Sequence, residues 1–574
     1  MNRCHILLFY LLINFFFIAC KKEKTNLPVS TPFNQKYNVL WLVAEDMSPN
    51  IPPFGDSTIQ TPHLSRLAAE GVCYTNVYSV SGVCAPSRAA LCTGMYPSSI
   101  GAHHMRTTTQ TANAKKYLGL IDYEVVPPPE VKMVSEIIRA NNYYCSNNSK
   151  TDYQFKPSKM AWDESSIYAH WRNRPAGKLF YSIFNFNVTH ESNMWNPRYG
   201  HFDNDAFPPP RHKKTAWQQF ENGEKPWSVP EGLNLNIPPY LPVTDLVKKD
   251  LRRMYSNIAE MDQHVGMIIG QLEEDGLLEN TIIVWYTDHG GPLPRQKRLL
   301  YDSGIKVPMI IRYPNQWQAG TTDDQLISFV DFAPTLLSMC HIEPPAHMQG
   351  RAFAGKYQSK NQRKYIHAAA DRFDESYDMK RAVRDKQFKY LKNFQPEIGY
   401  YLPLAYRKKM ATMHELLRMR KEGTLNKIQM QWFRSSKPEE ELFDVKNDPH
   451  ELNNLAGNPA YAEKLKELKN ECEHWMQKTN DKGLIPEEDL IQQFWPNKIQ
   501  PITAAPEIKK ENNQLFISCK TEGASIGYKY PEDELPESGW HIYKKPIELT
   551  AGKQIKIIAH RIGYAPSDTL VWKN

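Results

Sequence analysis

Four short apolar segments, separated by helical patterns, place the strongest limit on how this chain of 574 residues folds. The first, residues 38–44, lacks the alternation of polar and apolar side chains that marks a half-exposed strand. Similar segments follow at residues 179–186, 281–286 and 307–312. Strands that are apolar on both faces belong in a parallel sheet covered by helices, and the amphipathic stretch 245–274 predicts one such helix. We therefore predict an α/β doubly wound domain with a mostly parallel sheet over residues 37–360.

The sequence changes character twice after this domain. Between residues 361 and 495, charged segments surround shorter strands, which predicts a smaller α+β subdomain. Residues 500–574 contain short strands separated by turn residues, which predicts an appended β-sandwich. Its strands are expected around residues 508, 515–519, 526–530 and 555–560. The segments 521–528, 546–547 and 563–567 resemble the small β-domain appended to chitobiase-type glycosidases, which implies a structural or glycan-contacting role.

The N-terminal segment is typical of an exported bacterial protein. An apolar run from Ile6 to Ala19 is too short to cross a membrane, so residues 1–19 are predicted to be a signal peptide. Residues 17–20 resemble a lipobox, which implies a lipid such as palmitate on Cys20 and a polar tether over residues 20–36. A cleaved, unlipidated signal is the alternative. Both predict export, either to the periplasm or to a lipid anchor in the outer membrane.

Charge and cysteine content exclude several other classes of protein. The formal net charge is +7, without a dense basic stripe interleaved with aromatic residues, so nucleic acid is not predicted as a partner. An anionic substrate suits this charge better. The seven cysteines beyond residue 20 are widely spaced and odd in number, a pattern that indicates neither a disulfide framework nor a zinc site.

The most informative motif contains Cys84-Ala85-Pro86-Ser87-Arg88 and, a few residues later, Thr93-Gly94. Proline in a first turn and glycine after a last turn predict a helix that begins near Cys84. The backbone N–H groups at such a helix start favour a bound anion. A buried structural thiol is the commoner fate of a lone cysteine.

This motif resembles the signature of type I, formylglycine-dependent sulfatases of the alkaline-phosphatase superfamily. In that family a maturation enzyme oxidises the cysteine to Cα-formylglycine, so the resemblance implies that Cys84 becomes the nucleophile. An aldehyde hydrate has a second hydroxyl that can expel sulfate, which a sulfated thiol lacks. For Arg88 the resemblance implies that the guanidinium orients the hydrated aldehyde.

Two polar pairs follow directly after predicted strands. Glu45-Asp46 come after residues 38–44, and Asp288-His289 come after residues 281–286. Open α/β sheets bind their ligands at this carboxyl edge, and adjacent acids repel unless a cation holds them. The sulfatase resemblance implies a metal site built from these residues and Cys84, with Glu45 in place of the usual aspartate. We predict Ca²⁺, whose flexible coordination suits an irregular set of oxygen ligands.

Three further catalytic residues are implied by the same resemblance. Lys297 precedes a tyrosine by four residues, as the sulfate-contacting lysine of the family does, with Arg298 as a neighbouring candidate. Lys150 matches a second lysine, although Asp152 stands where the family has a histidine. His190 follows the strand at residues 179–186 and corresponds to the histidine that protonates the leaving alcohol. An imidazole with an ordinary pKa of about 6.5 suits that proton transfer.

The resemblance spans about residues 37–480 and implies a sulfuric ester hydrolase. An exported enzyme with a glycosidase-like appendage favours a sulfated polysaccharide or its oligosaccharides, such as ulvan or another marine polymer. The alternatives are a glycosaminoglycan or N-sulfoglucosamine sulfatase, a phosphodiesterase or phosphonate monoester hydrolase of the same superfamily, and a non-catalytic glycan-binding lipoprotein. Four residues are predicted to contact the sugar: His104, Arg372, Asp378 and Arg381.

Overall fold

The structure is a computed structural model that describes residues 33–195, 229–230, 232–533, 539–550 and 552–573. The predicted signal peptide, Cys20 and most of the predicted tether lie outside the described residues. Among the helices within these ranges, none combines the length and apolar character needed to cross a membrane.

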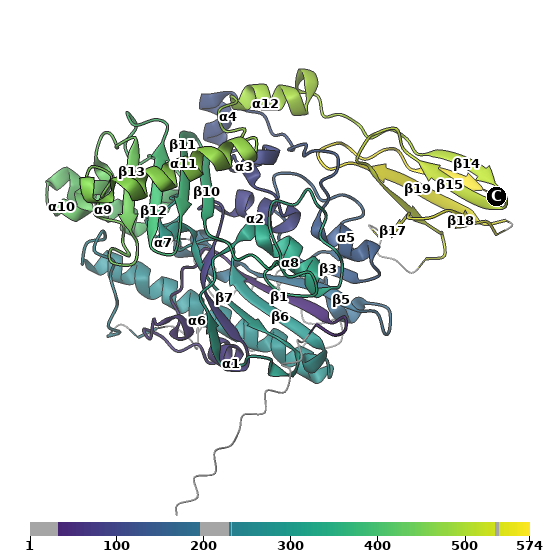
Figure 1. The fold of residues 1–574 in the computed structure, drawn as a ribbon, viewed down its shortest axis with the longest axis horizontal. Coiled ribbons are helices and arrows are strands. Elements are labelled where there is room, and N and C mark those ends of the chain that lie inside the picture. Colours follow the sequence, from purple (N-terminus) through teal and green to yellow (C-terminus); the bar gives the residue numbers. More distant parts are fainter. Residues whose placement is uncertain (1–32, 196–228, 231, 534–538, 551, 574) are drawn as a thin grey trace, which may run out of the picture.

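A nine-stranded sheet forms the centre of the molecule (Figure 1). Strand β1 (Asn38–Ala44) lies between β5 (Phe180–Phe186) and β6 (Thr281–Thr287) and runs parallel to both. The strand order is β4-β3-β5-β1-β6-β7-β2-β8, with β9 also paired to β2. The remaining strands are β2 (Val72–Tyr78), β3 (Tyr144–Asn148), β4 (Glu164–Ser165), β7 (Lys306–Arg312), β8 (Thr321–Asp323) and β9 (Ile327–Ser328). The predicted doubly wound, mostly parallel sheet is confirmed.

One strand of this sheet, β7, runs antiparallel to both of its neighbours, β6 and β2. The segment between β6 and β7 contains only one short helix, α7 (Asp302–Ile305). A parallel pairing of successive strands needs a crossover of a dozen or more residues that packs on the sheet. Residues 288–305 remain at the edge of the sheet where β6 ends, and they form no such crossover. The next strand, β7, therefore runs antiparallel to β6.

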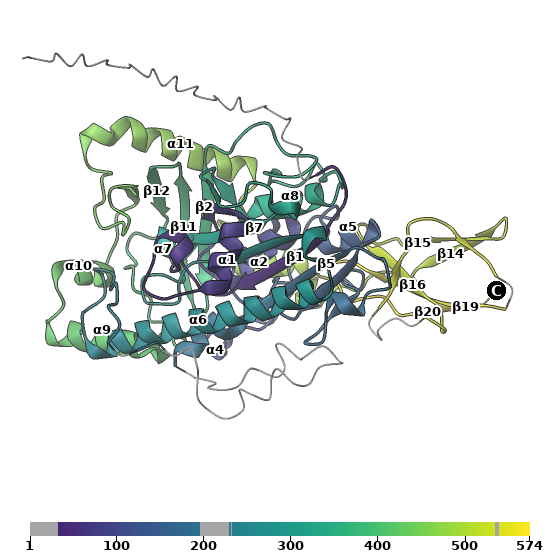
Figure 2. The same cartoon turned by 90° about the horizontal axis from the view of Figure 1, so that it is seen from below.

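Helices cover both faces of the sheet, which explains the unbroken apolar pattern of its strands. Alternate residues of β1 enter two separate hydrophobic cores, Leu40 and Leu42 on one face and Val39 and Trp41 on the other. The first core includes the long helix α6 (Asp245–Glu274), which lies along the sheet (Figure 2). Helix α1 (Pro62–Glu70) shares this core, whereas α2 (Cys84–Thr93), α3 (Pro97–Ile100), α5 (Val134–Ala140) and α8 (Phe332–Met339) pack into the second.

An antiparallel four-stranded sheet follows, at the side of the molecule opposite the C-terminus (Figure 1). Its strands are β10 (Ile366–Phe373), β11 (Ser376–Arg384), β12 (Phe388–Asn393) and β13 (Glu440–Asp444). Helix α11 (Ala462–Lys478) packs on β11 and β12, while α9 (Ala411–Glu422) packs on α6. The chain then passes through α12 (Glu487–Phe494), whose Glu487 is buried.

Two small antiparallel sheets end the chain and extend from one end of the molecule (Figures 1 and 2). One contains β14 (Glu507–Glu511), β15 (Gln514–Ser518) and β18 (Ile547–Glu548). The other contains β17 (His541–Ile542), β16 (Ser525–Lys529), β19 (Gln554–His560) and β20 (Leu570–Lys573). Leu515, Ile517, Ile547, Ile555 and Ile557 form a core of their own.

Candidate active site

Three neighbouring strands place polar residues at one edge of the central sheet. Glu45 and Asp46 follow β1, Asp288 and His289 follow β6, and a single turn after β5 leads to His190. The backbone N–H of Asp46 donates to Asp288 Oδ1 at 3.1 Å, which joins the first two strand ends directly. Parallel strands present their carboxyl ends on the same edge, so residues far apart in sequence meet there.

Cys84 lies at the first position of α2 and points into this cluster. Its Sγ is 3.2 Å from His289 Nε2, 3.7 Å from Asp46 Oδ1 and 3.6 Å from Lys297 Nζ. The helix ends at Gly94, whose positive φ of 70° forms the predicted C-cap. In the formylglycine that the sulfatase resemblance implies, an oxygen bonded to Cβ would take the place of Sγ. A nucleophile at this point is surrounded by acids and cations and is almost completely buried.

Each buried carboxylate of the cluster pairs with a different cation. Lys150 Nζ is 2.6 Å from Glu45 Oε2, Lys297 Nζ is 2.6 Å from Asp46 Oδ2, and Arg88 Nε is 3.2 Å from Asp288 Oδ2. Burial opposes ionisation of Asp288, but His289 and Arg88 outweigh it and lower its pKa to about 2. The pKa of Asp46 is likewise held well below its ordinary range, because Lys297 and two histidines overcome the effect of burial. Both aspartates are therefore anionic at neutral pH.

The donor set fits a hard divalent cation. The potential ligand atoms of Asp46, Cys84, Asp288 and His289 all lie within 4.8 Å of one another, and Glu45 belongs to an overlapping group. Glu45 Oε1 is buried and accepts no hydrogen bond within the part of the chain that the structure describes. Carboxylate oxygens concentrated in this way are the usual ligands of calcium or magnesium.

His289 is oriented toward the same point. Its Nδ1 lies 3.0 Å from the Gly290 carbonyl, which leaves Nε2 directed at the acids. Although burial lowers it, Asp288, Cys84 and Asp46 together raise the pKa of His289 to about 10. The local field thus favours positive charge at Nε2. Gly290 allows this close packing, since a Cβ there would lie 2.2 Å from the Ser303 carbonyl oxygen.

Comparison with known proteins agrees with this geometry. Residues 37–342 match the family model described as Sulfatase, and residues 295–431 match one described as N-sulphoglucosamine sulphohydrolase, C-terminal. The chain is 53% identical to an "Ulvan-active sulfatase" of Formosa agariphila, an alignment that covers 96% of this chain and 95% of that protein. The chain belongs to the sulfatase family. Membership implies that Cys84 matures to formylglycine and that the acidic cluster holds a divalent metal.

More distant relatives extend the comparison. Human N-sulphoglucosamine sulphohydrolase is 23% identical, over 81% of this chain and 95% of its own length. A structure solved in complex with its substrate D-glucosamine-2-N,6-O-disulfate has a TM-score of 0.54 at 20% identity and covers 79% of this chain and 100% of its own. A phosphonate monoester hydrolase of Agrobacterium radiobacter has a TM-score of 0.50 at 14% identity, covering 78% of this chain and 97% of its own. The two solved structures share the fold.

The structure decides between the two candidate cations of the sulfatase at positions 297 and 298. Lys297 is buried and reaches Asp46 and Cys84, as described above. Arg298 turns away and pairs with Glu191 and Asp374, at 2.9 Å in each case. Lys297 is therefore the residue that faces the nucleophile.

His190 also faces the cluster, at its more open side. Its Nδ1 contacts Ser192 Oγ at 2.8 Å, and its Nε2 lies 3.9 Å from Glu45 Oε2. Burial lowers the pKa of His190 well below its ordinary value. Asp152, which replaces the expected family histidine, lies with Oδ2 4.0 Å from Lys150 Nζ. An aspartate here adds negative charge beside Lys150.

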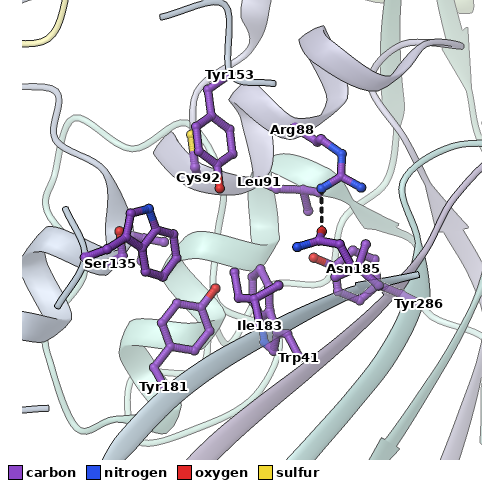
Figure 3. A pocket seen from close by; sticks show the side chains of 13 residues that line it. Trp41, Arg88, Leu91, Cys92, Ser135, Tyr153, Tyr181, Ile183, Asn185 and Tyr286 are labelled. Carbon is purple, nitrogen blue, oxygen red and sulfur yellow. Dashed lines mark hydrogen bonds between the residues drawn. The ribbon is translucent and has the colours of Figure 1, made fainter. Parts of the chain in front are cut away.

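Asn185, on β5, lies between Arg88 and the loop that carries Lys150. Arg88 Nη1 donates to Asn185 Oδ1 at 2.7 Å, the contact drawn in Figure 3. Asn185 Nδ2 donates to the Asn148 carbonyl at 3.0 Å, and Asn147 Nδ2 donates to the Lys150 carbonyl at 3.2 Å. This chain of hydrogen bonds links Arg88 to the loop of Lys150. The role of Asn185 was missed from the sequence, although an amide in a largely apolar strand is a recognisable signal.

The amide lies at the edge of a small internal cavity behind Arg88 (Figure 3). Tyr153, Tyr181 and Trp41 also line this cavity, whose volume of about 20 Å³ suits a single water molecule. The cavity is separate from the cluster around Cys84, and it leaves the inner side of the Arg88 guanidinium without close packing.

We predict that Asn185→Ala lowers kcat/KM for sulfate release by about tenfold to a hundredfold, because Arg88 and the Lys150 loop lose their common partner. The buried Arg88 nitrogen also loses its acceptor, which is expected to reduce the free energy of unfolding by about 1–3 kcal/mol. Steady-state kinetics and chemical denaturation measure the two effects. Ser182→Ala is the matched control, since it removes a buried hydrogen bond to Ser146 from the same strand. An equal loss of activity in both variants contradicts the positioning role.

Substrate contact by the four predicted sugar-binding residues is not supported, because their polar groups are buried in protein contacts. Arg372 forms a two-pronged pair with Glu487, including Nη2–Oε1 at 2.7 Å. Arg381 pairs with Asp481 at 2.7 Å and with Asp371 at 3.1 Å. The other two are equally enclosed: Asp378 contacts Lys437 and Lys380, and His104 Nδ1 accepts from the Arg372 N–H. These residues stabilise the loops around the site.

Proposed function

We propose that this sulfatase hydrolyses sulfate esters on ulvan or on oligosaccharides derived from it. The observation that carries the proposal is the 53% identity to an ulvan-active sulfatase over nearly the whole of both chains. The burial of Cys84 among acids and cations supports the same chemistry. Incubation of the matured protein with ulvan oligosaccharides tests it, and sulfate release is the expected result.

The residues around Cys84 each suit one part of the reaction. When residue 84 carries formylglycine, its hydrate supplies one hydroxyl for attack on sulfur and a second for release of sulfate. A bound Ca²⁺, held by Glu45, Asp46, Asp288 and His289, would supply Lewis-acid polarisation. Lys150, Lys297 and Arg88 bring fixed positive charge to the sulfate oxygens, where negative charge spreads in the transition state. They need little rearrangement, because ion pairs already hold them.

We assign protonation of the departing sugar alcohol to His190. The ring is held through Nδ1 by Ser192, which leaves Nε2 facing the centre. This assignment agrees with the more open position of His190, beside the direction from which a sugar enters.

His190→Asn is expected to lower kcat on a sugar sulfate by about 10²- to 10⁴-fold, because the alcohol then departs without a proton donor. The loss is expected to be much smaller on 4-nitrophenyl sulfate, whose phenolate leaves without protonation. Parallel kinetics on the two substrates measure the difference. His170→Asn is the control, since His170 is also buried with a pKa lowered by burial, to about 4, but bonds to Gln271. Equal losses on both substrates rule out the proton-donor role.

A second candidate function is supported by the match of residues 295–431 to the C-terminal model of N-sulphoglucosamine sulphohydrolase. Under this alternative the substrate carries an N-sulfate and the bond broken is S–N. Competition between ulvan oligosaccharides and N-sulfoglucosamine distinguishes the two. An aryl phosphodiester belongs in the same panel, because a strong preference for it would identify a phosphodiesterase or phosphonate monoester hydrolase instead.

We further propose that the chain is exported and attached by a lipid on Cys20, in the outer membrane or facing the periplasm. The apolar run before Cys20 and the lipobox-like residues 17–20 support this location. A formylglycine-generating enzyme is then the required maturation partner. Mass analysis of the mature N-terminus checks the lipid. The Cys20→Ser variant, which has no cysteine to carry the lipid, is expected in the soluble fraction of fractionated cells.

A further inference from the structure

We propose that Arg106 binds a second anionic group of the substrate, a hexuronate carboxylate or a second sulfate, next to the ester that is hydrolysed. This inference rests on the proposed function and identifies the chemical class of its substrate more closely. Three observations support it: the backbone conformation at Arg106, the N–H donors of its guanidinium that remain available, and two aromatic rings beside it, Tyr406 and Trp195.

The backbone on both sides of Arg106 is held firmly. The Met105 N–H donates to the Arg372 carbonyl at 2.9 Å, and Arg372 Nη1 donates to the Met105 carbonyl at 3.1 Å. On the other side, the Thr107 N–H donates to Gln154 Oε1 at 3.0 Å, and Gln154 Nε2 donates to the His104 carbonyl. The loop is thus fixed by residues 104, 105 and 107, while the side chain of residue 106 is left to project.

Arg106 itself has a φ of 61°, in the left-handed region that a non-glycine side chain rarely adopts. Such a conformation persists only where surrounding contacts impose it, and it is concentrated at functional sites. Here the contacts of Arg372 and Gln154 impose it. Two of the residues that were predicted to bind sugar, Arg372 and His104, therefore contribute indirectly, because their contacts fix the loop that carries Arg106.

The guanidinium of Arg106 keeps most of its donors available. Its side chain is 30% exposed, and Nε lies 3.5 Å from Asp374 Oδ1, longer than a hydrogen bond. Asp374 is occupied by a closer partner, Arg298 at 2.9 Å. Among the described residues, the terminal nitrogens of Arg106 donate no hydrogen bond to protein. A planar guanidinium with two free N–H edges is suited to bind a carboxylate or sulfate through two hydrogen bonds.

Arg106 lies close to the catalytic groups. Although burial lowers it, Asp374, Asp152 and Cys84 together raise the pKa of Arg106, so its charge interacts with the nucleophile position. It also contributes to the lowered pKa of His190, the residue on the side where the alcohol departs. The geometry agrees, because Arg106 and Arg298 both lie beside Asp374 and the Tyr406 ring, and Arg298 directly follows Lys297, whose Nζ is 3.6 Å from Cys84 Sγ.

Two aromatic rings, Tyr406 and Trp195, lie beside Arg106. Arg106 Cζ lies 5.5 Å from the centre of the Tyr406 ring, and Trp195 packs edge-on against that ring, with centroids 4.9 Å apart. Both rings are partly exposed. The Tyr406 ring is already contacted by Arg106, Arg298 and Lys409. Aromatic faces stack on the C–H faces of sugars, so Trp195 supplies the surface for the sugar while Arg106 binds its charge. An uncharged sugar would leave the guanidinium desolvated without a partner.

The test compares three substrates on the matured full-length protein: a sulfated oligosaccharide with a uronate, its carboxyl-reduced counterpart, and a disulfated sugar without uronate. In the wild type, one of the two doubly anionic substrates is expected to exceed the carboxyl-reduced one in kcat/KM by at least about tenfold, and Arg106→Gln should remove that preference through KM. Arg106→Lys is expected to recover part of it, since lysine keeps the charge but lacks the fork. The preferred substrate identifies carboxylate or sulfate as the ligand.

Lys409→Gln is the matched control, because Lys409 Nζ also lies 5.5 Å from the Tyr406 ring centre but is exposed at the surface. This variant should keep the wild-type preference. An equal loss in both variants would show a general effect of charge and overturn the inference, as would an Arg106→Gln variant that keeps the preference or a wild type that has none. If the wild type releases sulfate from no substrate, the proposed function itself has failed, which is a distinct outcome.

Discussion

Cys84→Ala is expected to lower kcat for sulfate release by about a millionfold, the scale seen when an enzyme loses its nucleophile. The substitution removes the sulfur atom that projects from the start of α2 toward Asp46, His289 and Lys297. Alanine has no group that can be oxidised to an aldehyde, so maturation and attack on sulfur are lost together. Steady-state kinetics on ulvan oligosaccharides measure the loss.

Cys92→Ala provides the matched control for this experiment. Cys92 is buried on the same helix, and its Sγ donates to the Ala89 carbonyl one turn earlier. It is expected to keep activity while losing some stability through a small cavity. Mass analysis of the peptide that spans residue 84 should show an aldehyde in the wild type and in Cys92→Ala. Substantial turnover by Cys84→Ala would disprove the nucleophile assignment.

Removal of divalent metal is expected to lower kcat/KM by about a thousandfold or more, because Lewis-acid polarisation of the sulfate is lost. A second readout is independent of activity. Calcium that binds only the folded protein adds about 2.7 kcal/mol of stability at a concentration one hundred times its Kd. The midpoint of thermal unfolding should therefore rise with added Ca²⁺ after treatment with a chelator.

Asp288→Asn is expected to abolish most of this calcium-dependent stabilisation, since a neutral amide replaces a carboxylate among the proposed ligands. Asp262→Asn is the control, because Asp262 is also a buried aspartate but accepts from the backbone N–H groups of His63 and Leu64. It should lower stability and leave the calcium-dependent increase intact. A Ca²⁺ response that survives in Asp288→Asn places the metal elsewhere.

The pH dependence of calcium affinity follows from the carboxylates. Burial raises the pKa of Glu45, whereas the pKa of Asp288 is about 2 and that of Asp46 is held well below its ordinary value. Among the three carboxylates, a raised pKa means that Glu45 takes up a proton first as pH falls, while both aspartates remain charged. His289, whose pKa is raised to about 10 by Asp288, Cys84 and Asp46 against the effect of burial, is already protonated in the metal-free site over this range. Calcium affinity is therefore expected to decline through the titration of Glu45. Glu45→Gln should flatten this decline, which calorimetric titration over a pH series can measure.

Sequence patterns were sufficient to predict the sheet and the residues at its edge. The strands β1 and β6 are apolar on both faces, and Glu45 and Asp288 follow them directly, so their meeting is a consequence of parallel topology. The helix that begins at Cys84 was equally readable from its proline and glycine. These segments adopt the conformation that their local sequence favours, because burial of their apolar side chains stabilises the same conformation.

The sugar-binding residues could not be predicted in the same way. Charged residues such as Arg372 and Arg381 look alike in sequence whether they face a ligand or a buried partner. Their carboxylate partners, Glu487 and Asp481, lie about a hundred residues later and become neighbours only through tertiary packing. Arg106 gives no distinct signal either, because its exposure depends on the conformation of the loop around it.

The pairing of Arg372 with Glu487 has a consequence for where this enzyme can be divided. Glu487 opens α12, beyond both segments matched by family models, yet it anchors the arginine that fixes the loop of Arg106. Gene fusions, domain exchanges and shortened versions that cut before α12 would leave a guanidinium buried without its counter-charge. The catalytic unit therefore extends at least through Phe494.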